Sequence, residues 1–152
     1  MPLLHLSINA AEPAKTAGFL ADLLGGEAMP FPPFPDSWIA FSERDDGTAI
    51  EVYPLTHRLF AGAQQVDCRS EEPLGGPTFV HAAIGSPLSR QDIMERARAR
   101  GWTSRLCDRG PFKCVEIWLE NRLLVEVLDP EMQEQYRSGM RRSNWRRMFN
   151  LP

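Results

Sequence analysis

Two histidines and two glutamates recur in the sequence at almost the same separation. His5 precedes Glu51 by 46 residues, and His81 precedes Glu126 by 45. Two imidazoles and two carboxylates form a ligand set for a divalent cation such as Zn, Ni, Co, Mn or Fe(II). Two glutamates would neutralise the 2+ charge, and an octahedral ion would keep two positions for water or adjacent substrate oxygens. Such an ion supports Lewis-acid chemistry in which Glu51 or Glu126 moves a proton.

Each of these four residues lies in a short apolar segment that alternates like a strand. In a strand, successive side chains point to opposite faces, so the apolar neighbours of each ligand candidate share one face and the candidate lies on the other. If the apolar faces pack under helices, all four candidates face the other side of the sheet. The segments are LLHLSIN (3–9), AIEVYP (49–54), FVHAAIG (79–85) and LLVEVLDP (123–130).

The elements around these strands also repeat. Pro13 suits a first helical position, and Gly25-Gly26 predicts the end of that helix. Ser89, with Asp92 three residues later, resembles a capping box that opens a second helix, which stops at Gly101. Further strands are predicted at 38–42, 49–53, 103–107, 112–119 and 123–128, with a hairpin turn at Asp46-Gly47. The sequence therefore predicts an α+β protein of two tandem βαβββ modules, 1–57 and 77–130, joined by a connection, 58–76, within one structural domain.

Two segments stand outside this repeat. Residues 27–38 contain four prolines and predict an edge strand or loop with exposed Phe31 and Phe34. A helix is expected to start at Asp129-Pro130, and the extension 131–152 alternates five arginines with apolar residues. A basic amphipathic tail can bind a membrane surface or nucleic acid, but docking on its own domain or on a partner subunit is the favoured interpretation.

Composition is ordinary for a globular chain, with 43% apolar and 24% charged residues. A net charge of −3 and a pI of about 5.6 argue against nucleic acid or an anionic membrane as the main partner. The three cysteines match no CxxC spacing, which favours a reduced, intracellular protein. Cys107 and Cys114 flank one predicted hairpin and could approach each other, as a reduced pair. No signal-peptide pattern opens the sequence, so a cytoplasmic location is expected.

Several stretches together resemble the vicinal oxygen chelate superfamily, which includes glyoxalase I, fosfomycin-resistance enzymes, extradiol dioxygenases and bleomycin-resistance proteins. The resemblance rests on the element order and on FLADLLGGEA (19–28), DDGTAIEVYP (45–54) and FVHAAIG (79–85). It implies that the modules form a cupped mixed sheet with helices on its outer face. It also implies metal ligands on the first and last strand of each module, which here are His5, Glu51, His81 and Glu126. This set is most similar to that of glyoxalase I.

The first functional hypothesis is a metalloenzyme, a lyase, isomerase or oxygenase, acting on a small molecule with adjacent oxygens. An extradiol dioxygenase would need a further acid/base histidine, and only His57 remains, expected at the surface. Tyr53 is expected on the cavity face beside Glu51, where its hydroxyl is a candidate to support the metal ligands; a packing role is the alternative.

The alternative hypothesis is a metal-free binding protein of the bleomycin-resistance type. In that case the cup and aromatic residues would hold an apolar ligand, and the candidate pocket residues are Tyr53, Trp38, Phe34 and Phe31. A homodimer is expected in either case, because a cupped sheet leaves edges that a second copy can cover.

Overall fold

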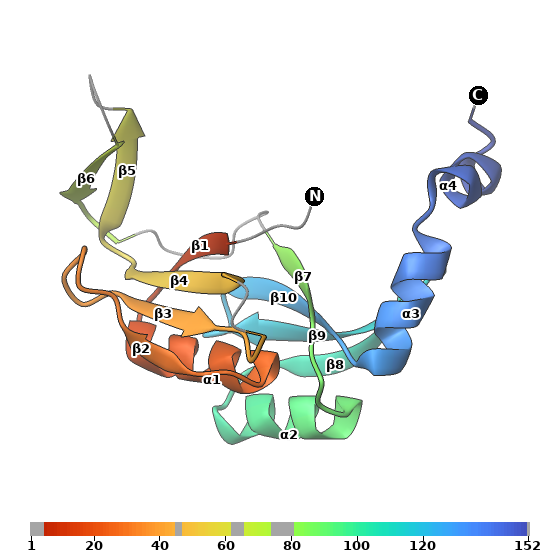
Figure 1. Ribbon diagram of the computed structural model, residues 1–152, viewed down its shortest axis with the longest axis horizontal. Coiled ribbons are helices and arrows are strands. Elements are labelled where there is room, and N and C mark those ends of the chain that lie inside the picture. Colours follow the sequence, from red (N-terminus) through yellow and green to blue (C-terminus); the bar gives the residue numbers. More distant parts are fainter. Residues whose placement is uncertain (1–4, 45–46, 62–65, 74–80, 152) are drawn as a thin grey trace. The chain divides into compact units, whose positions relative to one another are not determined.

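The computed structural model describes residues 5–44, 47–61, 66–73 and 81–151 of the chain. The chain divides into two compact units, unit 1 (Met1–Gly76) and unit 2 (Pro77–Pro152) (Figure 1). Of the predicted strand and turn residues, Leu3, Leu4, Asp46, Phe79 and Val80 lie outside the described residues.

Unit 1 contains a four-stranded mixed sheet in the order β1-β4-β3-β2, with β1 parallel to β4 and the other pairs antiparallel. This agrees with the predicted order of strand, helix and three strands. A separate two-stranded hairpin, β5-β6, follows. The elements are β1 (His5–Ala10), α1 (Pro13–Leu24), β2 (Ala28–Pro30), β3 (Trp38–Phe41), β4 (Ala49–Pro54), β5 (His57–Ala61) and β6 (Val66–Ser70).

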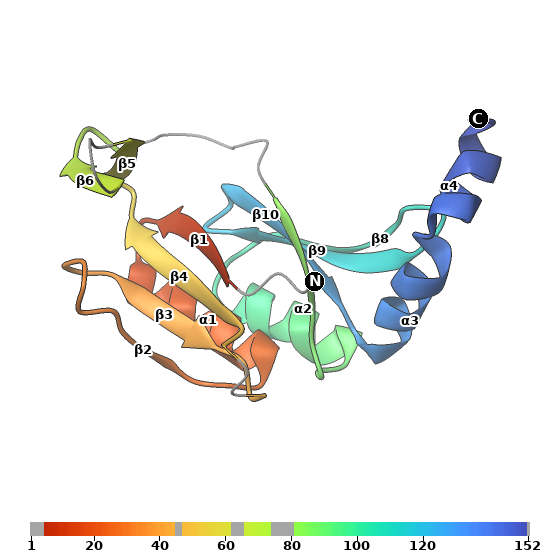
Figure 2. The ribbon, with the colours of Figure 1, turned by 45° about the horizontal axis from the view of Figure 1, so that its top comes forward.

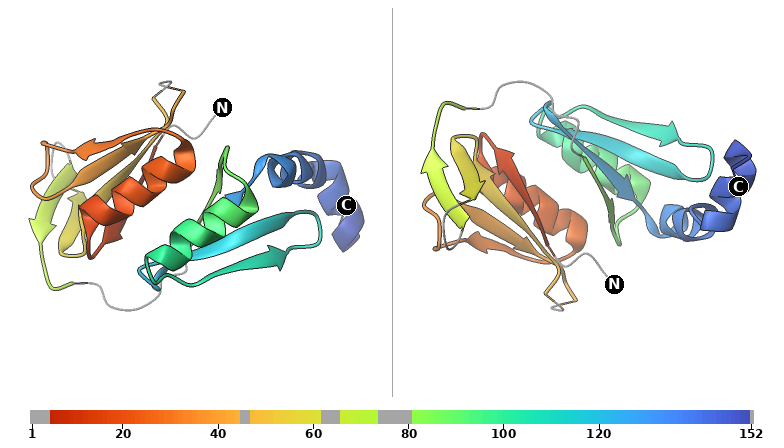
Figure 3. Two further views of the ribbon diagram at one scale, coloured as in Figure 1. Left: turned by 90° about the horizontal axis from the view of Figure 1, so that it is seen from below. Right: turned by 90° about the horizontal axis from the view of Figure 1, so that it is seen from above.

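Helix α1 begins and ends where the sequence predicts. Pro13 occupies its first turn, and Gly25 caps its end with a left-handed φ of 69°, a conformation that glycine adopts without cost. The helix covers one face of the sheet, as Figure 3 shows. Its buried side, with Phe19, Leu20 and Leu23 at 0% exposure, packs mainly on β3 and β4. Ile8, Ile50 and Val52 therefore form the helix-covered face of this sheet.

The β5-β6 hairpin lies largely within the segment 58–76 that we predicted as the connection between modules, where no strands were predicted. The sequence there mixes turn formers with scattered apolar residues and has no clear alternation, which hid the strands. His57 pairs with Ser70 at its open end. The side chain of Arg58 donates a hydrogen bond of 2.8 Å to the carbonyl of Glu72 and pairs with Glu71 at 3.6 Å.

Unit 2 repeats the arrangement, with a four-stranded sheet in the order β7-β10-β9-β8 in which β7 is parallel to β10. Helix α2 lies on one face of this sheet (Figure 2). Two mixed four-stranded sheets, each with a helix on one face, confirm the predicted α+β class and the tandem modules. The elements are β7 (Ala82–Gly85), α2 (Arg90–Ala99), β8 (Ser104–Asp108), β9 (Lys113–Leu119), β10 (Leu123–Leu128), α3 (Pro130–Gly139) and α4 (Arg142–Phe149).

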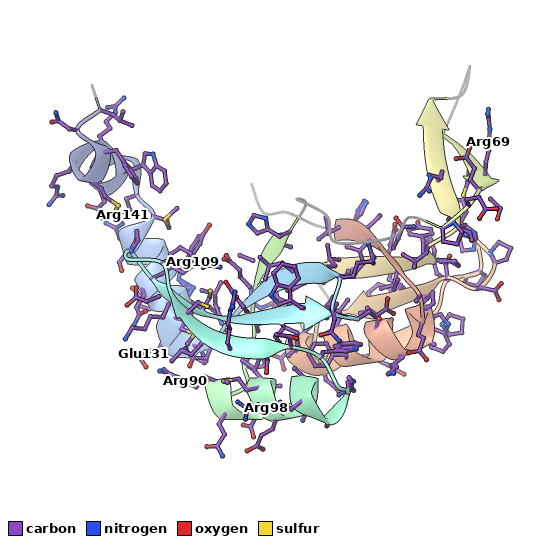
Figure 4. All side chains as sticks on the ribbon, turned by 180° about the vertical axis from the view of Figure 1, so that it is seen from behind. Arg69, Arg90, Arg98, Arg109, Glu131 and Arg141 are labelled. Carbon is purple, nitrogen blue, oxygen red and sulfur yellow. The ribbon has the colours of Figure 1, made fainter. Side chains whose placement is uncertain are left out.

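The helix starts of unit 2 confirm the capping predictions. Ser89 Oγ accepts a hydrogen bond of 3.2 Å from the backbone N–H of Asp92 at the start of α2. Asp129 Oδ1 does the same for the N–H of Met132, at 2.9 Å, at the start of α3. Arg90 then ties the two helix starts together, because its guanidinium pairs with Asp129 at 2.8 Å and Glu131 at 2.5 Å (Figure 4). None of the helices in the described residues is long and apolar enough to cross a bilayer.

Candidate metal centre

In unit 1, His5 and Glu51 lie on the same face of the sheet, opposite the helix. In the parallel register of β1 and β4, His5 is opposite Ala49 and Ser7 is opposite Glu51. Residues that lie opposite each other on paired strands share a face of the sheet, and so do alternate residues along one strand. His5 and Glu51 are therefore diagonal neighbours on adjacent strands. His5 is exposed and Glu51 is partly exposed. The strand parity predicted from the sequence is therefore confirmed for this pair.

The carboxylate of Glu51 is oriented by two neutral hydroxyls. Ser7 Oγ donates a hydrogen bond of 2.7 Å to Oε2, and the Tyr53 hydroxyl donates one of 2.8 Å to the same oxygen. Burial, followed by the hydrogen bond to Glu51, raises the pKa of Tyr53, so the phenol stays a donor. Among the described residues, Oε1 of Glu51 accepts no hydrogen bond.

Ser7 was missed by the sequence analysis, whereas the contact of Tyr53 with Glu51 was foreseen. The signal for both was spacing, because each hydroxyl lies two residues beyond a ligand candidate, on the same strand and therefore on the same face. A carboxylate that ligates a metal is commonly held by such outer hydrogen bonds. Ser7 and Tyr53 fit that supporting position.

Aromatic rings cover Tyr53 on this face. Phe34 meets its ring edge-on with centroids 5.3 Å apart, and Phe31 does so at 6.1 Å. Both phenylalanines are therefore partly buried, not exposed as the proline-rich loop had suggested. His57 also departs from the surface position expected for it, because it is only partly exposed, with its ring 6.4 Å from that of Tyr53.

Trp38 was wrongly grouped with these aromatic residues. In the antiparallel register of β3 and β4 it lies opposite Val52, and its neighbour Ile39 lies opposite Glu51. Directly opposed residues share a face, so Trp38 belongs to the helix-covered face. It cannot line a pocket beside Glu51. The reason for the error is the two-residue period of a strand, in which a shift of one position changes the face.

Unit 2 repeats the diagonal arrangement of histidine and glutamate. His81 immediately precedes β7, in which Ala82 pairs with Val125 and Ala83 pairs with Glu126. When this pairing is continued back by one residue, it sets a residue of β10 opposite His81, and Glu126 lies two positions after that residue. In unit 1, Glu51 likewise lies two positions after the residue opposite His5. His81 is exposed, whereas Glu126 retains only 8% exposure.

A guanidinium, not a hydroxyl, holds the carboxylate of Glu126. Arg109 Nε and Nη2 lie 2.9 and 2.7 Å from its Oε1. Arg109 Nη2 also donates to Oε1 of Glu116 at 2.5 Å, and Arg105 pairs with the other oxygen of Glu116. The hydrogen bond to Glu126 is the main cause that raises the pKa of Arg109. Oε2 of Glu126 accepts no hydrogen bond among the described residues.

Sequence patterns alone do not predict this network. Glu116 and Arg105 occupy strand positions where a charged residue ordinarily faces solvent. Arg109 lies in the turn between β8 and β9, far from Glu126 in the sequence. A weak signal existed, because Glu116 sits between Val115 and Ile117, just as the two candidate glutamates sit between apolar neighbours.

Each unit contains a pair of side chains of the types that a divalent metal ion accepts. Each unit offers one exposed imidazole and one carboxylate that has one oxygen fixed by neighbours and the other without a hydrogen-bond partner. Imidazole and carboxylate are the ligands that Zn, Ni, Mn and Fe(II) accept. Within the described ranges no three histidine, cysteine, aspartate or glutamate side chains gather closely enough to hold an ion. Each unit thus supplies a pair of donors.

Solved structures with a similar fold include a resistance protein, a lyase and an oxidase. The fosfomycin resistance protein FosX from Listeria monocytogenes matches 83% of this chain and 88% of its own, with a TM-score of 0.55 at 16% identity. Lactoylglutathione lyase from Agrobacterium tumefaciens matches 83% and 91%, with a TM-score of 0.53 at 13% identity. The oxidase ChaP-H1 matches 85% and 95%, with a TM-score of 0.51 at 19% identity.

No protein-family model matches the sequence, and no curated protein does. The structural likeness, at identities below 20%, is therefore a likeness of fold. Together with the two matching sheets, it confirms the resemblance noted from the sequence: the chain has the vicinal oxygen chelate fold. The solved proteins with this fold include lyases, resistance proteins and an oxidase, so the fold leaves the reaction open.

Proposed function

We propose that this protein is a divalent-metal-dependent enzyme acting on a small molecule with adjacent oxygens. We assign the metal-ligand roles to His5 and Glu51 in unit 1 and to His81 and Glu126 in unit 2. The observation that carries the proposal is the repeated half-site. In each unit the histidine lies at the start of the first strand or immediately before it, and the glutamate lies on the last strand, which pairs with the first in parallel; both glutamates leave one carboxylate oxygen without a hydrogen-bond partner among the described residues.

The structural neighbours support this choice of chemistry. One FosX structure from Listeria monocytogenes contains Mn(II) and sulfate, and that protein matches 90% of this chain with a TM-score of 0.53 at 15% identity. A glyoxalase I from Leishmania major matches 92% of this chain, with a TM-score of 0.53 at 14% identity. Both are similar to this chain in fold, and the two His-Glu pairs of this chain offer imidazole and carboxylate donors of the kind that such an ion accepts.

When bound, the ion supplies Lewis-acid polarisation of a substrate carbonyl or hydroxyl oxygen. The two glutamates then serve different roles. Arg109 donates a hydrogen bond to Glu126 through Nε and forms an ion pair with it through Nη2, which suits a permanent ligand. Glu51 is held by the neutral hydroxyls of Ser7 and Tyr53, which can reorient as its charge changes. We therefore assign the proton-accepting role to Glu51.

The aromatic cluster of unit 1 favours a second candidate, a metal-free protein that binds an apolar ligand. Phe31 and Phe34 pack around Tyr53 on the same face as Glu51, which provides an apolar surface next to a polar group. Binding sites commonly combine these features. Metal content separates this candidate from the first, because the aromatic cluster needs no ion.

Elemental analysis of tag-free protein tests the proposal. The wild type is expected to carry about one transition-metal ion per site, and the His81→Ala, Glu126→Ala double variant is expected to lose it. A Glu95→Gln variant on the exposed face of α2 is the matched control and should keep the metal. The identity of the ion directs the substrate search, with Ni or Zn pointing to lyase or isomerase chemistry and Fe to oxygenase chemistry. A wild type that neither carries nor accepts any of these ions would overturn the proposal in favour of apolar ligand binding.

A further inference from the structure

The C-terminal helix α4 presents an apolar surface to solvent. Six large apolar side chains of the described residues are well exposed, and four of them lie at this end of the chain. The rings of Trp145 and Phe149, one helical turn apart, contact each other with centroids 4.6 Å apart. We call this surface the arm tip. It consists of Trp145 (43% exposed), Met148 (49%), Phe149 (53%) and Leu151 (49%).

Helices α3 and α4 together form what we call the arm, and α3 anchors it to the rest of unit 2. Helix α3 buries Met132 completely, and Tyr136 packs edge-on against Phe112 at 4.7 Å. Gly139 lies so close to the carbonyl oxygen of Pro111 that a Cβ there would come within 2.4 Å of it, so only glycine fits.

Hydrogen bonds also fix the junction between α3 and α4. Asn144 Nδ2 donates hydrogen bonds to the carbonyls of Ser138, at 2.8 Å, and Gly139, at 3.3 Å, at the end of α3. Arg147 in turn donates to Asn144 Oδ1 at 3.0 Å. Within unit 2, α4 stands away from the sheet in each view (Figures 1 and 2). A pre-ordered arm loses little freedom when it docks, which favours association.

Charge is distributed very unevenly along the chain. Residues 135–152 contain five arginines and no acidic residue, which gives +5. Unit 1, residues 1–76, contains 11 acidic and 4 basic residues, which gives −7. Residues 77–134 contain 9 acidic and 8 basic residues, so the three parts sum to the total of −3. The net charge therefore hides a basic arm and an acidic unit 1.

We propose that the arm tip docks on the acidic unit 1 of a second copy of this chain. The arginines of the arm complement that unit electrostatically, and Trp145 and Phe149 supply the aromatic anchors that interfaces favour. An anionic membrane or a nucleic acid would attract the arm but repel unit 1, so the rest of the chain would oppose binding. Reciprocal docking of two arms gives a closed two-fold dimer with two equal interfaces. The proposal is independent of the metal site.

Sedimentation velocity of the full chain provides the first test. The wild type is expected to dimerise, with a dissociation constant that rises at least tenfold between 50 and 500 mM NaCl. Two double variants, Trp145→Ala with Phe149→Ala and Arg146→Gln with Arg147→Gln, should each raise that constant at least tenfold. The pair Arg96→Gln with Arg98→Gln on α2 removes the same charge elsewhere and should leave it unchanged. Circular dichroism verifies that every variant is folded.

Cross-linking identifies the surface that receives the arm. A photoreactive benzoylphenylalanine is placed at position 149, and this chain is mixed with isotope-labelled wild type. Cross-links are expected between position 149 of one copy and residues 5–73 of the labelled copy. The proposal is overturned by a monomeric wild type, by a dimer that tolerates both double variants, or by cross-links confined to one copy. Binding of the wild type to vesicles containing phosphatidylserine, without arm-dependent dimerisation, would overturn it in favour of a lipid surface.

Discussion

Glu116 and Glu126 lie directly opposite each other on β9 and β10, and one side chain, Arg109, hydrogen-bonds to both. Two carboxylates in this position repel each other, and both are buried, at 3% and 8% exposure. The guanidinium offsets that repulsion. A candidate metal ligand is thus part of the ion-pair network of unit 2.

Removal of this guanidinium should destabilise unit 2. Arg109→Met leaves two buried carboxylates without their shared cation, and breaking a buried pair costs about 3–5 kcal/mol. Because Arg109 is itself 35% exposed, we expect a smaller loss, about 2–3 kcal/mol, by urea denaturation at pH 7. Arg105→Met is the control, since that side chain is 62% exposed and its loss should cost less. Equal losses for the two variants would contradict the bridging role of Arg109.

Acid should weaken the fold through Glu116. Burial alone would raise the pKa of this carboxyl, but hydrogen bonds from Arg105 and Arg109 outweigh burial and lower it from its ordinary value near 4.5. Because the pKa of this carboxyl is lower in the folded than in the unfolded state, the carboxylate stabilises the fold at a pH above the ordinary pKa. This contribution is lost as the pH falls below that value. Glu116→Gln should therefore be less stable at pH 7 yet lose less stability between pH 5 and 3. Denaturation series at these pH values measure the slope, and Glu95→Gln should keep the wild-type slope.

Alkaline pH should destabilise the fold because Cys114 is buried. Burial, followed by the nearby charge of Glu126, raises the pKa of this thiol from its ordinary value near 9 to about 12. A raised folded pKa means that the stabilisation is complete below pH 9 and is lost between pH 9 and 12, by up to about 1.4 kcal/mol per pH unit. Cys114→Ala should flatten this decline in denaturation measured from pH 8 to 10.

The thiol itself gives an independent readout. Cys114 has no exposed surface, and it lies directly opposite Cys107 on β8 and β9, where both thiols are free. Burial also raises the pKa of Cys107. Iodoacetamide at pH 8.5 should therefore alkylate Cys114 only after unfolding in urea, as peptide mass spectrometry would show. Rapid labelling of Cys114 in the native protein would rule out the buried, protonated thiol described here.

The hydroxyls beside Glu51 should tune metal affinity if the proposed site is correct. Loss of a group that orients a ligand typically costs 10–100-fold in affinity. Tyr53→Phe and Ser7→Ala should each weaken metal binding by about that factor, measured by competition with a chromophoric chelator. Tyr136→Phe makes the same chemical change on α3 and should have no effect. Unchanged affinity in both hydroxyl variants would remove Ser7 and Tyr53 from the site.

Much of the fold was predictable because the relevant signals are local. Pro13 and Gly25 bound the first helix, Ser89 and Asp129 cap two others, and strand alternation placed His5 and Glu51 on one face. These features depend on a few consecutive residues.

The remaining features depend on pairing between distant segments. Arg109 reaches Glu126 only because β8, β9 and β10 lie side by side, and Trp38 faces the helix because of the register of β3 on β4. The β5-β6 hairpin is stabilised by pairing that its mixed sequence does not signal. Single-sequence patterns contain no direct information on such contacts.

The register of the parallel strands has a consequence for protein engineering. His5 and Glu51 are 46 residues apart in the sequence, and His81 and Glu126 are 45 apart. Both pairs nevertheless have the same diagonal relation, because the residues that pair between β7 and β10 are also one residue closer in the sequence than those that pair between β1 and β4. Ligand geometry is therefore decoupled from the length of the loops between the first and last strand of a unit. Residues inserted beside Gly47, at the hairpin before β4, should lengthen the chain without moving either donor, which makes that turn a suitable place to graft a peptide or a reporter.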